Sequence, residues 1–347
     1  MEDAFDKYIF GYKMEIETKE NQYIIKINEL KIKKQSQSKG RAIREVYEEV
    51  KEKVNKGIIT QNTKKNNLSY YNKLQIRMFK INQKITKFGF SVIYDDISEE
   101  AIVKLERICE KIDVNKNYSI KKTQEIEDEI AMVLQPYIIN PHIRALNMSS
   151  LIMNTNHISK FSHIIEQAYI NLFREEYIST VMILTPVIEG ILLSLYGFNF
   201  RNKKPKDQQL LNKWAELQYK DMSSKIPNQY IIDEYIRAFI DISEQMIFSK
   251  HQIANKYSYF NRNYIAHVMG DGKFYSRNNA YKLIHLIDLM AHVLAACNNQ
   301  HSRYAFDREN IEYKMRVHYY TTLIEKRDIE EVQRYIMNSH NNFKGYI

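Results

Sequence analysis

The sequence predicts a mainly α-helical protein with a smaller α+β region at its N-terminus. Apolar residues recur at intervals of three and four along most of the longer segments, which is the spacing of one helix face. The chain has only nine Gly and five Pro in 347 residues, too few for a turn-rich β sandwich. A hydrophobic fraction of 44% can form real cores, and the length allows two domains of ordinary size.

The first forty residues have a different pattern from the rest. Apolar residues alternate with polar ones over 12–16 and again over 23–27, on either side of a polar break, and this period of two predicts a small hairpin. Further along, we expect a charged helix over 42–54, a basic helix over 68–84 and a short strand over 88–94. A helix capped by Asp95 and Asp96 should follow over 97–112, and a last helix over 123–134 should end at Pro136.

Pro136 and Pro141 mark the predicted domain boundary. Two of the five prolines fall within six residues there, and proline clusters are typical of turns and linkers. We therefore expect a basic α+β region of unknown family over residues 1–140, a helical bundle over 150–300 and a C-terminal helical extension over 301–347.

The second half of the chain predicts a bundle of four or five helices. We expect Pro186 to kink or break one of them near Ile183, and Gly197 to end that helix. Ser276 is a suitable N-cap for the last bundle helix. The apolar residues Ile329, Val332 and Ile336 predict helix in the extension. The expected bundle helices span 159–173, 177–196, 208–217, 231–248 and 277–297.

The net charge of +9 is concentrated in one segment. Residues 53–94 contain nine Lys or Arg and no Asp or Glu, and aromatic residues, among them Tyr70, Tyr71, Phe79 and Phe88, are interleaved with them. Such a strip suits a polyanion, because each neutralised phosphate releases counterions; the alternative is a solvated helix face. The predicted nucleic-acid-binding residues are Lys64, Lys65, Lys73, Arg77, Lys80, Lys84 and Lys87.

The segment 259–270, YFNRNYIAHVMG, places three polar groups among apolar and aromatic residues. On a helix, Asn263 and His267 share one face, and Arg262 lies beside Asn263. Phosphodiester cleavage needs such groups: His can take the proton of a 2′-hydroxyl or supply one to the leaving 5′-oxygen, and Arg can hold the phosphate. RNA is therefore the expected partner. A two-fold dimer would bring a second His267 into the same cleft, so that one serves as base and the other as acid.

Arg262, Asn263 and His267 resemble, position by position, the Arg-x4-His signature of HEPN ribonucleases. The resemblance covers roughly residues 155–297, and residues 177–190 are similar to an early helix of that superfamily that carries an inward acid, here Glu189. It implies a HEPN-like helical bundle and a metal-independent endoribonuclease without cofactor, dimeric and active in bacterial antiphage defence, abortive infection or stress. Many relatives have Gly directly after the His, whereas Val268 and Met269 precede Gly270 here.

Other interpretations of the motif remain open. The same Arg, Asn and His could pair with Glu189 and stabilise a bundle core. The chain could then be a catalytically silent HEPN scaffold that binds nucleic acid, or a toxin component restrained by a regulatory protein partner.

The remaining patterns bear on metals, cofactors and compartment. Tyr281, His285, Asp288 and His292 form one helical stripe, but no fourth metal ligand accompanies them, and an Asp288–His292 hydrogen-bonded pair explains the spacing equally well. No Gly-rich phosphate loop is visible. The acidic start does not resemble a secretory signal, two cysteines far apart predict no disulfide framework, and no uninterrupted apolar run is of membrane-spanning length. We expect a cytoplasmic protein with no membrane partner.

Overall fold

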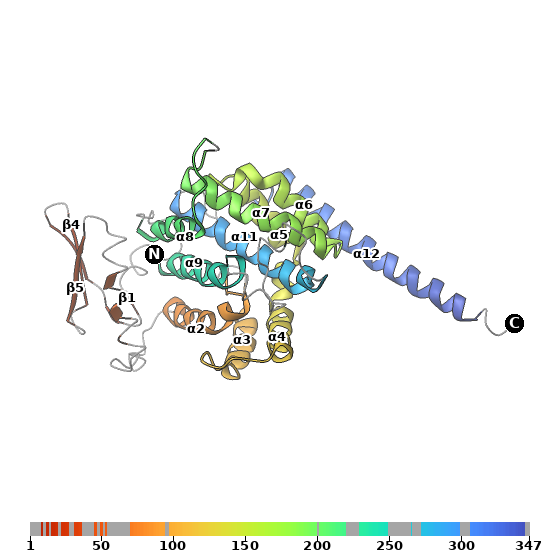
Figure 1. The fold of residues 1–347 in the computed structure, drawn as a ribbon, viewed down its shortest axis with the longest axis horizontal. Coiled ribbons are helices and arrows are strands. Elements are labelled where there is room, and N and C mark those ends of the chain that lie inside the picture. Colours follow the sequence, from red (N-terminus) through yellow and green to blue (C-terminus); the bar gives the residue numbers. More distant parts are fainter. Residues whose placement is uncertain are drawn as a thin grey trace.

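The computed structural model covers the whole chain and describes residues 8–9, 12–13, 15–19, 22–27, 31–36, 45–46, 49–50, 53, 70–93, 97–199, 201–219, 229–248, 265, 272–298 and 306–343. Helices dominate these residues, as the sequence predicts (Figure 1). The small strands lie at one end of the molecule, and the C-terminal half of the last helix projects from the other end.

The N-terminal strands confirm the predicted hairpin and extend it. β3 (Glu15–Lys19) pairs antiparallel with β4 (Gln22–Ile27), with Ile16 opposite Ile25, and β5 (Ile32–Ser36) adds a third strand on the other side of β4. A separate two-residue pair joins β1 (Tyr8–Ile9) to β2 (Tyr12–Lys13). In the expected helix at 42–54, the described residues 45–46, 49–50 and 53 are helical.

The helical body begins with α2 (Tyr70–Ile85) and the 3-10 turn η3 (Thr86–Phe88). The predicted strand over 88–94 is wrong, because residues 90–93 are buried without joining a sheet. Their backbone bonds locally instead: Phe90 N donates to the Ile85 carbonyl, and Val92 N donates to Asn82 Oδ1 at 2.8 Å. This segment leads to α3 (Glu99–Glu110), which is capped by the Ser98 hydroxyl; the predicted caps Asp95 and Asp96 lie outside the described residues.

Prolines do not interrupt the helices where the sequence predicts. α4 (Ile120–Ile138) passes through Pro136, and α7 (Tyr177–Tyr196) runs unbroken through Pro186. Each proline removes the hydrogen bond to the carbonyl four residues earlier, and both prolines are exposed, as are Met132 and Met182 at those earlier positions. Water can therefore satisfy the carbonyls that lose their donors. Gly197 ends α7 in the left-handed conformation, as predicted.

Residue 140 does not separate two cores. Asn140 caps α5 (Pro141–Leu146), a π-helical turn, η5 (Asn147–Ile152), follows, and one connected hydrophobic cluster extends from Met78 to Leu323. The rest of the body consists of η6 (Ser159–Phe161), α6 (Ser162–Phe173), α8 (Asp207–Ala215), η7 (Glu216–Tyr219), α9 (Gln229–Ile242), η8 (Ser243–Ile247) and η10 (Gly272–Tyr275).

α11 (Arg277–Cys297) is the central helix, begins at the predicted cap Ser276, and packs against α4, α7 and α9 (Figure 1). Every residue from Asn279 to Cys297 is buried, so this helix is surrounded by protein on all sides. α7 and α11 are long and apolar enough to cross a membrane by length and composition, a test that core helices of soluble proteins also pass.

α12 (Ile311–Phe343) is the predicted helical extension. Its 33 residues span about 50 Å at the usual helical rise. Tyr313, Tyr320 and Leu323 are buried against the body, whereas Ile329 and Val332 are each 58% exposed on the projecting half.

Candidate functional site

The predicted catalytic residues Arg262, Asn263 and His267 lie outside the residues that the structure describes. Ile265, in the middle of the motif, is described: it is helical, 2% exposed and part of the hydrophobic core. This one position of the motif is therefore packed within the body of the protein.

Glu189, the acid that the resemblance assigns to the site, lies on α7. Its side chain is 15% exposed, and one carboxylate oxygen is 2.5 Å from Lys204 Nζ. Lys204 belongs to the basic loop between α7 and α8, so the pair attaches this loop to α7.

Three of the four strip residues whose side chains are described bind other parts of the protein. Arg77 binds Glu106 through two nitrogens at 2.7 and 2.8 Å and also binds Glu99 of α3. These hydrogen bonds, that of Glu106 first, raise the pKa of Arg77 above its ordinary value. Lys84 Nζ donates to the Cys109 carbonyl at 2.6 Å, and Lys87 Nζ donates to the Val114 carbonyl at 2.5 Å. These three cations therefore stabilise the packing of α2 and η3 against α3 and the turn after it.

The other strip residues are less constrained. Lys80 is exposed on α2. Lys73 lies within α2, but its side chain is not among those described, and Lys64 and Lys65 lie outside the described residues.

A buried ion pair includes Asp288 in the middle of α11. Arg144 of α5 binds its carboxylate with two nitrogens, Nη2 at 2.6 Å and Nη1 at 2.8 Å, and both side chains are 1% exposed. Asn147 Nδ2 donates to the same carboxylate at 2.9 Å, and the Arg144 guanidinium lies 5.2 Å from the Tyr169 ring centroid. Burial by itself would raise the pKa of Asp288, but the charge and hydrogen bonds of Arg144 outweigh it and hold the pKa below 3.8.

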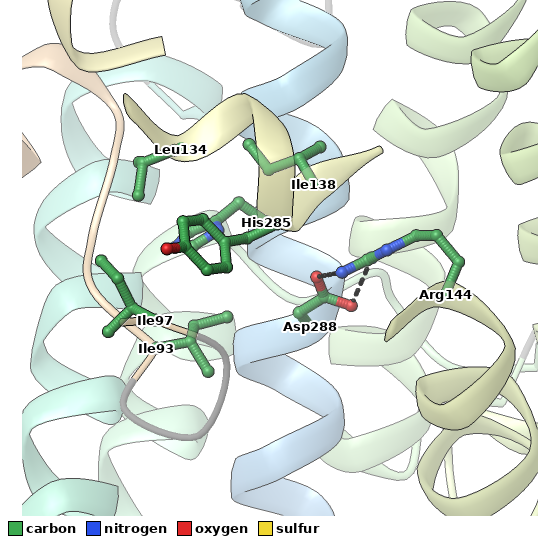
Figure 2. Close-up of a pocket in the computed structure, with 8 residues that line it drawn as sticks. Ile93, Ile97, Leu134, Ile138, Arg144, His285 and Asp288 are labelled. Carbon is green, nitrogen blue, oxygen red and sulfur yellow. Dashed lines mark hydrogen bonds and ion pairs between the residues drawn. The ribbon is translucent and has the colours of Figure 1, made fainter. Parts of the chain in front are cut away.

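A small pocket adjoins this pair and is shown in Figure 2. Arg144 and Asp288 supply its charged groups, and His285 supplies an imidazole. The imidazole of His285 is 3.2 Å from the Ser91 hydroxyl. Apolar residues form most of the remaining wall: Ile93, Ile97, Leu134 and Ile138.

The helical stripe Tyr281, His285, Asp288 and His292 is entirely buried in α11. The polar contacts of Asp288 are with Arg144 of α5, Asn147 of η5 and Tyr169 of α6. His292 packs edge-on against Tyr235, with ring centroids 6.0 Å apart. Over the described part of the chain, no three His, Cys, Asp or Glu side chains are grouped closely enough to hold a metal ion.

A second buried pair lies one turn from the start of α11. Lys282 Nζ is 2.8 Å from Glu127 of α4, with the two side chains 0% and 5% exposed. Burial lowers the pKa of Lys282, and the Glu127 carboxylate opposes that shift. Sequence reasoning missed this pair and the Arg144–Asp288 pair, because the two partners of each pair are far apart in the chain. The signal that could have indicated them is a single cation, Arg144 or Lys282, within an otherwise mainly apolar segment, since such a residue is buried only when it is paired.

Comparison with protein families, with curated proteins and with solved structures finds no match to this chain.

Proposed function

We propose that this protein is a metal-independent endoribonuclease that cuts RNA by attack of the substrate's 2′-hydroxyl. The observation that carries the proposal is the arrangement Arg262-Asn263-x3-His267, which combines a fixed cation, an orienting amide and a base that titrates near neutrality. Its resemblance to the HEPN signature supports the same activity, a HEPN-like bundle and a role in bacterial antiphage defence or stress. A cytoplasmic location is part of the proposal and is supported by two cysteines far apart in the sequence, which predict no disulfide framework.

The burial of Ile265 supports an exposed catalytic face. On the helix expected for this segment, Asn263 and His267 are each two residues from Ile265, about 200° around the helix axis. Because Ile265 points into the core, we expect the amide and the imidazole to face away from it, where a phosphate can reach them. A purely structural Arg–Asn–His group would be expected on the buried side instead.

In the proposed reaction, His267 of one protomer takes the proton of the 2′-hydroxyl, whose oxygen attacks the phosphorus. The bond from phosphorus to the 5′-oxygen breaks, and the second His267 of the dimer protonates the leaving oxygen. Arg262 stabilises the additional negative charge on the phosphate in the transition state. The products are a 2′,3′-cyclic phosphate end and a 5′-hydroxyl end.

The test is incubation of purified protein with end-labelled RNA in the presence of a chelator. We expect His267→Ala to lower the cleavage rate about 10²- to 10⁴-fold, the usual contribution of an acid–base group, and Arg262→Ala to lower it about 10²- to 10³-fold. The matched controls are His318→Ala and Arg308→Ala, since both residues are exposed and lie on or just before α12. RNA with a 2′-O-methyl group at the cut should be spared.

Two outcomes would contradict this mechanism: loss of cleavage in chelator, or equal cleavage of the 2′-blocked RNA. A silent scaffold predicts RNA binding without any cleavage that depends on His267. A toxin component restrained by a partner predicts that cleavage, and toxicity on expression, are suppressed when that partner is co-expressed.

A further inference from the structure

The end of the α6–α7 hairpin gathers a hydroxyl, an imidazole and an ammonium group. Ser194, in the last turn of α7, has its Oγ 3.2 Å from His157 Nδ1 and accepts a hydrogen bond from Lys160 Nζ at 3.1 Å. His157 has a φ of +70°, a left-handed conformation that is costly for a residue with a Cβ. Its neighbour Ile158 is fully buried, so the fold holds His157 in this conformation and directs its ring to Ser194.

The basic loop after α7 lies at the same end of the hairpin. Phe161, at the start of α6, packs so closely against Gly190 of α7 that an added Cβ would lie 2.8 Å from its ring. Ser194 lies one turn beyond Gly190 on α7. Glu189, next to Gly190, forms an ion pair with Lys204 that attaches the basic loop to α7. The loop is further ordered by Asn199, whose side chain accepts from Arg201 N and whose carbonyl accepts from Asn202 N.

Positive charge dominates this surface. The segment that contacts the end of α7, 154–165, and the segment that follows α7, 198–206, contain no Asp or Glu. Lys160, Arg201, Lys203 and Lys206 are all exposed. The strip on α2 and η3 differs, because Arg77, Lys84 and Lys87 there are bound to carboxylates and carbonyls of the protein.

An aromatic side chain adjoins the loop. Tyr196 is 40% exposed and lies seven residues beyond Glu189, on the same face of α7. Exposed rings next to clustered cations are the combination that binds single-stranded nucleic acid, because unpaired bases stack on the rings while the cations follow the phosphates. Serine hydroxyls and histidine or lysine N–H groups are also common phosphate donors.

We propose that this surface, the hairpin-end patch formed by His157, Lys160, Ser194, Arg201, Lys203 and Lys206 with Tyr196 beside it, binds the backbone of the single-stranded RNA substrate. The inference rests on the proposed ribonuclease function and names the place on the fold where the substrate strand is held. The patch supplies affinity, and the residues of 262–267 supply the chemistry.

The test separates binding from cleavage by using an RNA that cannot be cut. A short 5′-fluorescein-labelled oligonucleotide of mixed sequence, 2′-O-methylated throughout, is titrated with protein at a series of KCl concentrations and followed by fluorescence anisotropy. The patch variant replaces Lys160, Arg201, Lys203 and Lys206 with Gln. The control variant removes the same number of charges from exposed lysines of α3, α4 and the turn between them, by replacing Lys104, Lys111, Lys121 and Lys122 with Gln.

We expect the patch variant to bind at least about tenfold more weakly than wild type at physiological salt. The slope of log affinity against log salt should fall by about 2 to 3, since each lost phosphate contact on a single strand removes about 0.7. The control variant should keep the wild-type slope. Equal affinity and equal salt dependence in the patch and control variants would refute the proposal that this patch binds RNA.

A second measurement does not depend on how the variants fold. Wild-type protein is photo-crosslinked to the same oligonucleotide carrying 4-thiouridine, and the modified peptides are mapped. Adducts within 154–165 or 194–206 support the patch, whereas adducts confined to 70–87 assign the strand to α2 and overturn it. If wild type cleaves RNA but the patch variant binds normally, only the patch is wrong; if wild type neither binds nor cleaves RNA, the proposed function fails with it.

Discussion

Replacing Asp288 by Asn should strongly destabilise the folded protein, because it leaves the Arg144 guanidinium buried without its counter-charge. Asn has nearly the shape of Asp, so the change removes charge rather than volume. Both side chains are 1% exposed, and two nitrogens of Arg144 reach the carboxylate at 2.6 and 2.8 Å. Breaking one side of such a pair costs about 3–5 kcal/mol in the free energy of unfolding.

This cost should appear as a large shift in thermal stability. At about 2.1 cal/mol/K of unfolding entropy per residue, each kcal/mol lowers the melting temperature of a 347-residue chain by about 1–2 °C, so the expected decrease is about 3–10 °C. The assay is urea and thermal unfolding followed by far-UV circular dichroism. Glu216→Gln is the matched control, because its ion pair with Lys213 is exposed on both sides and should contribute less than about 1 kcal/mol.

The double variant Arg144→Met/Asp288→Leu tests the reason for the loss. Removing both charges together leaves no unpaired ion in the core, so we expect it to be close to wild type in stability and well above Asp288→Asn. If Asp288→Asn behaved like the Glu216→Gln control, or if the double variant were the least stable protein, the assignment of a buried, mutually dependent pair would be refuted.

Three further predictions follow from the same structure. Gly89→Ala should lower the free energy of unfolding more than Gly197→Ala. Both glycines have a positive φ, which costs about 1 kcal/mol for Ala, but only at Gly89 would the new Cβ clash, 2.6 Å from Met246 Sδ. Equal losses of unfolding free energy in urea titrations would contradict this prediction. The difference in unfolding free energy between wild type and Asp288→Asn should stay constant above about pH 4 and decrease as the pH falls through the lowered pKa of Asp288. The reason is that the folded wild type loses its ionised carboxylate there. A difference that does not change from pH 7 down to the acid limit of folding would argue against this assignment. In equal mixtures of wild-type and His267→Ala chains, activity should fall to about a quarter of that of wild type if each cleft needs both histidines; activity of about a half would show that each chain works alone.

The sequence by itself determined the elements whose signals are local. The period of two over 12–27 predicted the hairpin, and the three-and-four spacing predicted most helices of the body to within a few residues. Ser276 and Gly197 were identified as helix ends because capping depends on a residue's own side chain or allowed φ. The motif at 262–267 was also visible, since residue types and spacing alone define it.

Only the tertiary structure decided what depends on burial and on partners distant in the chain. The mainly apolar residues 90–93 predicted a strand, yet other segments bury them, and their backbone bonds locally: Phe90 N donates to the Ile85 carbonyl and Val92 N donates to Asn82. Pro136 did not end its helix because it lies on the solvent side, and its position relative to solvent is not encoded in its neighbours.

The partners of the charged side chains also depend on the tertiary structure. Arg77 appeared available for a phosphate until the fold placed Glu106, 29 residues away, against it. Lys160 and Lys203 are far apart in the sequence, and only the α6–α7 hairpin places their segments at the same end of that hairpin. The sequence determines how much charge a segment carries, but whether a cation contacts protein or solvent depends on the segments that fold against it.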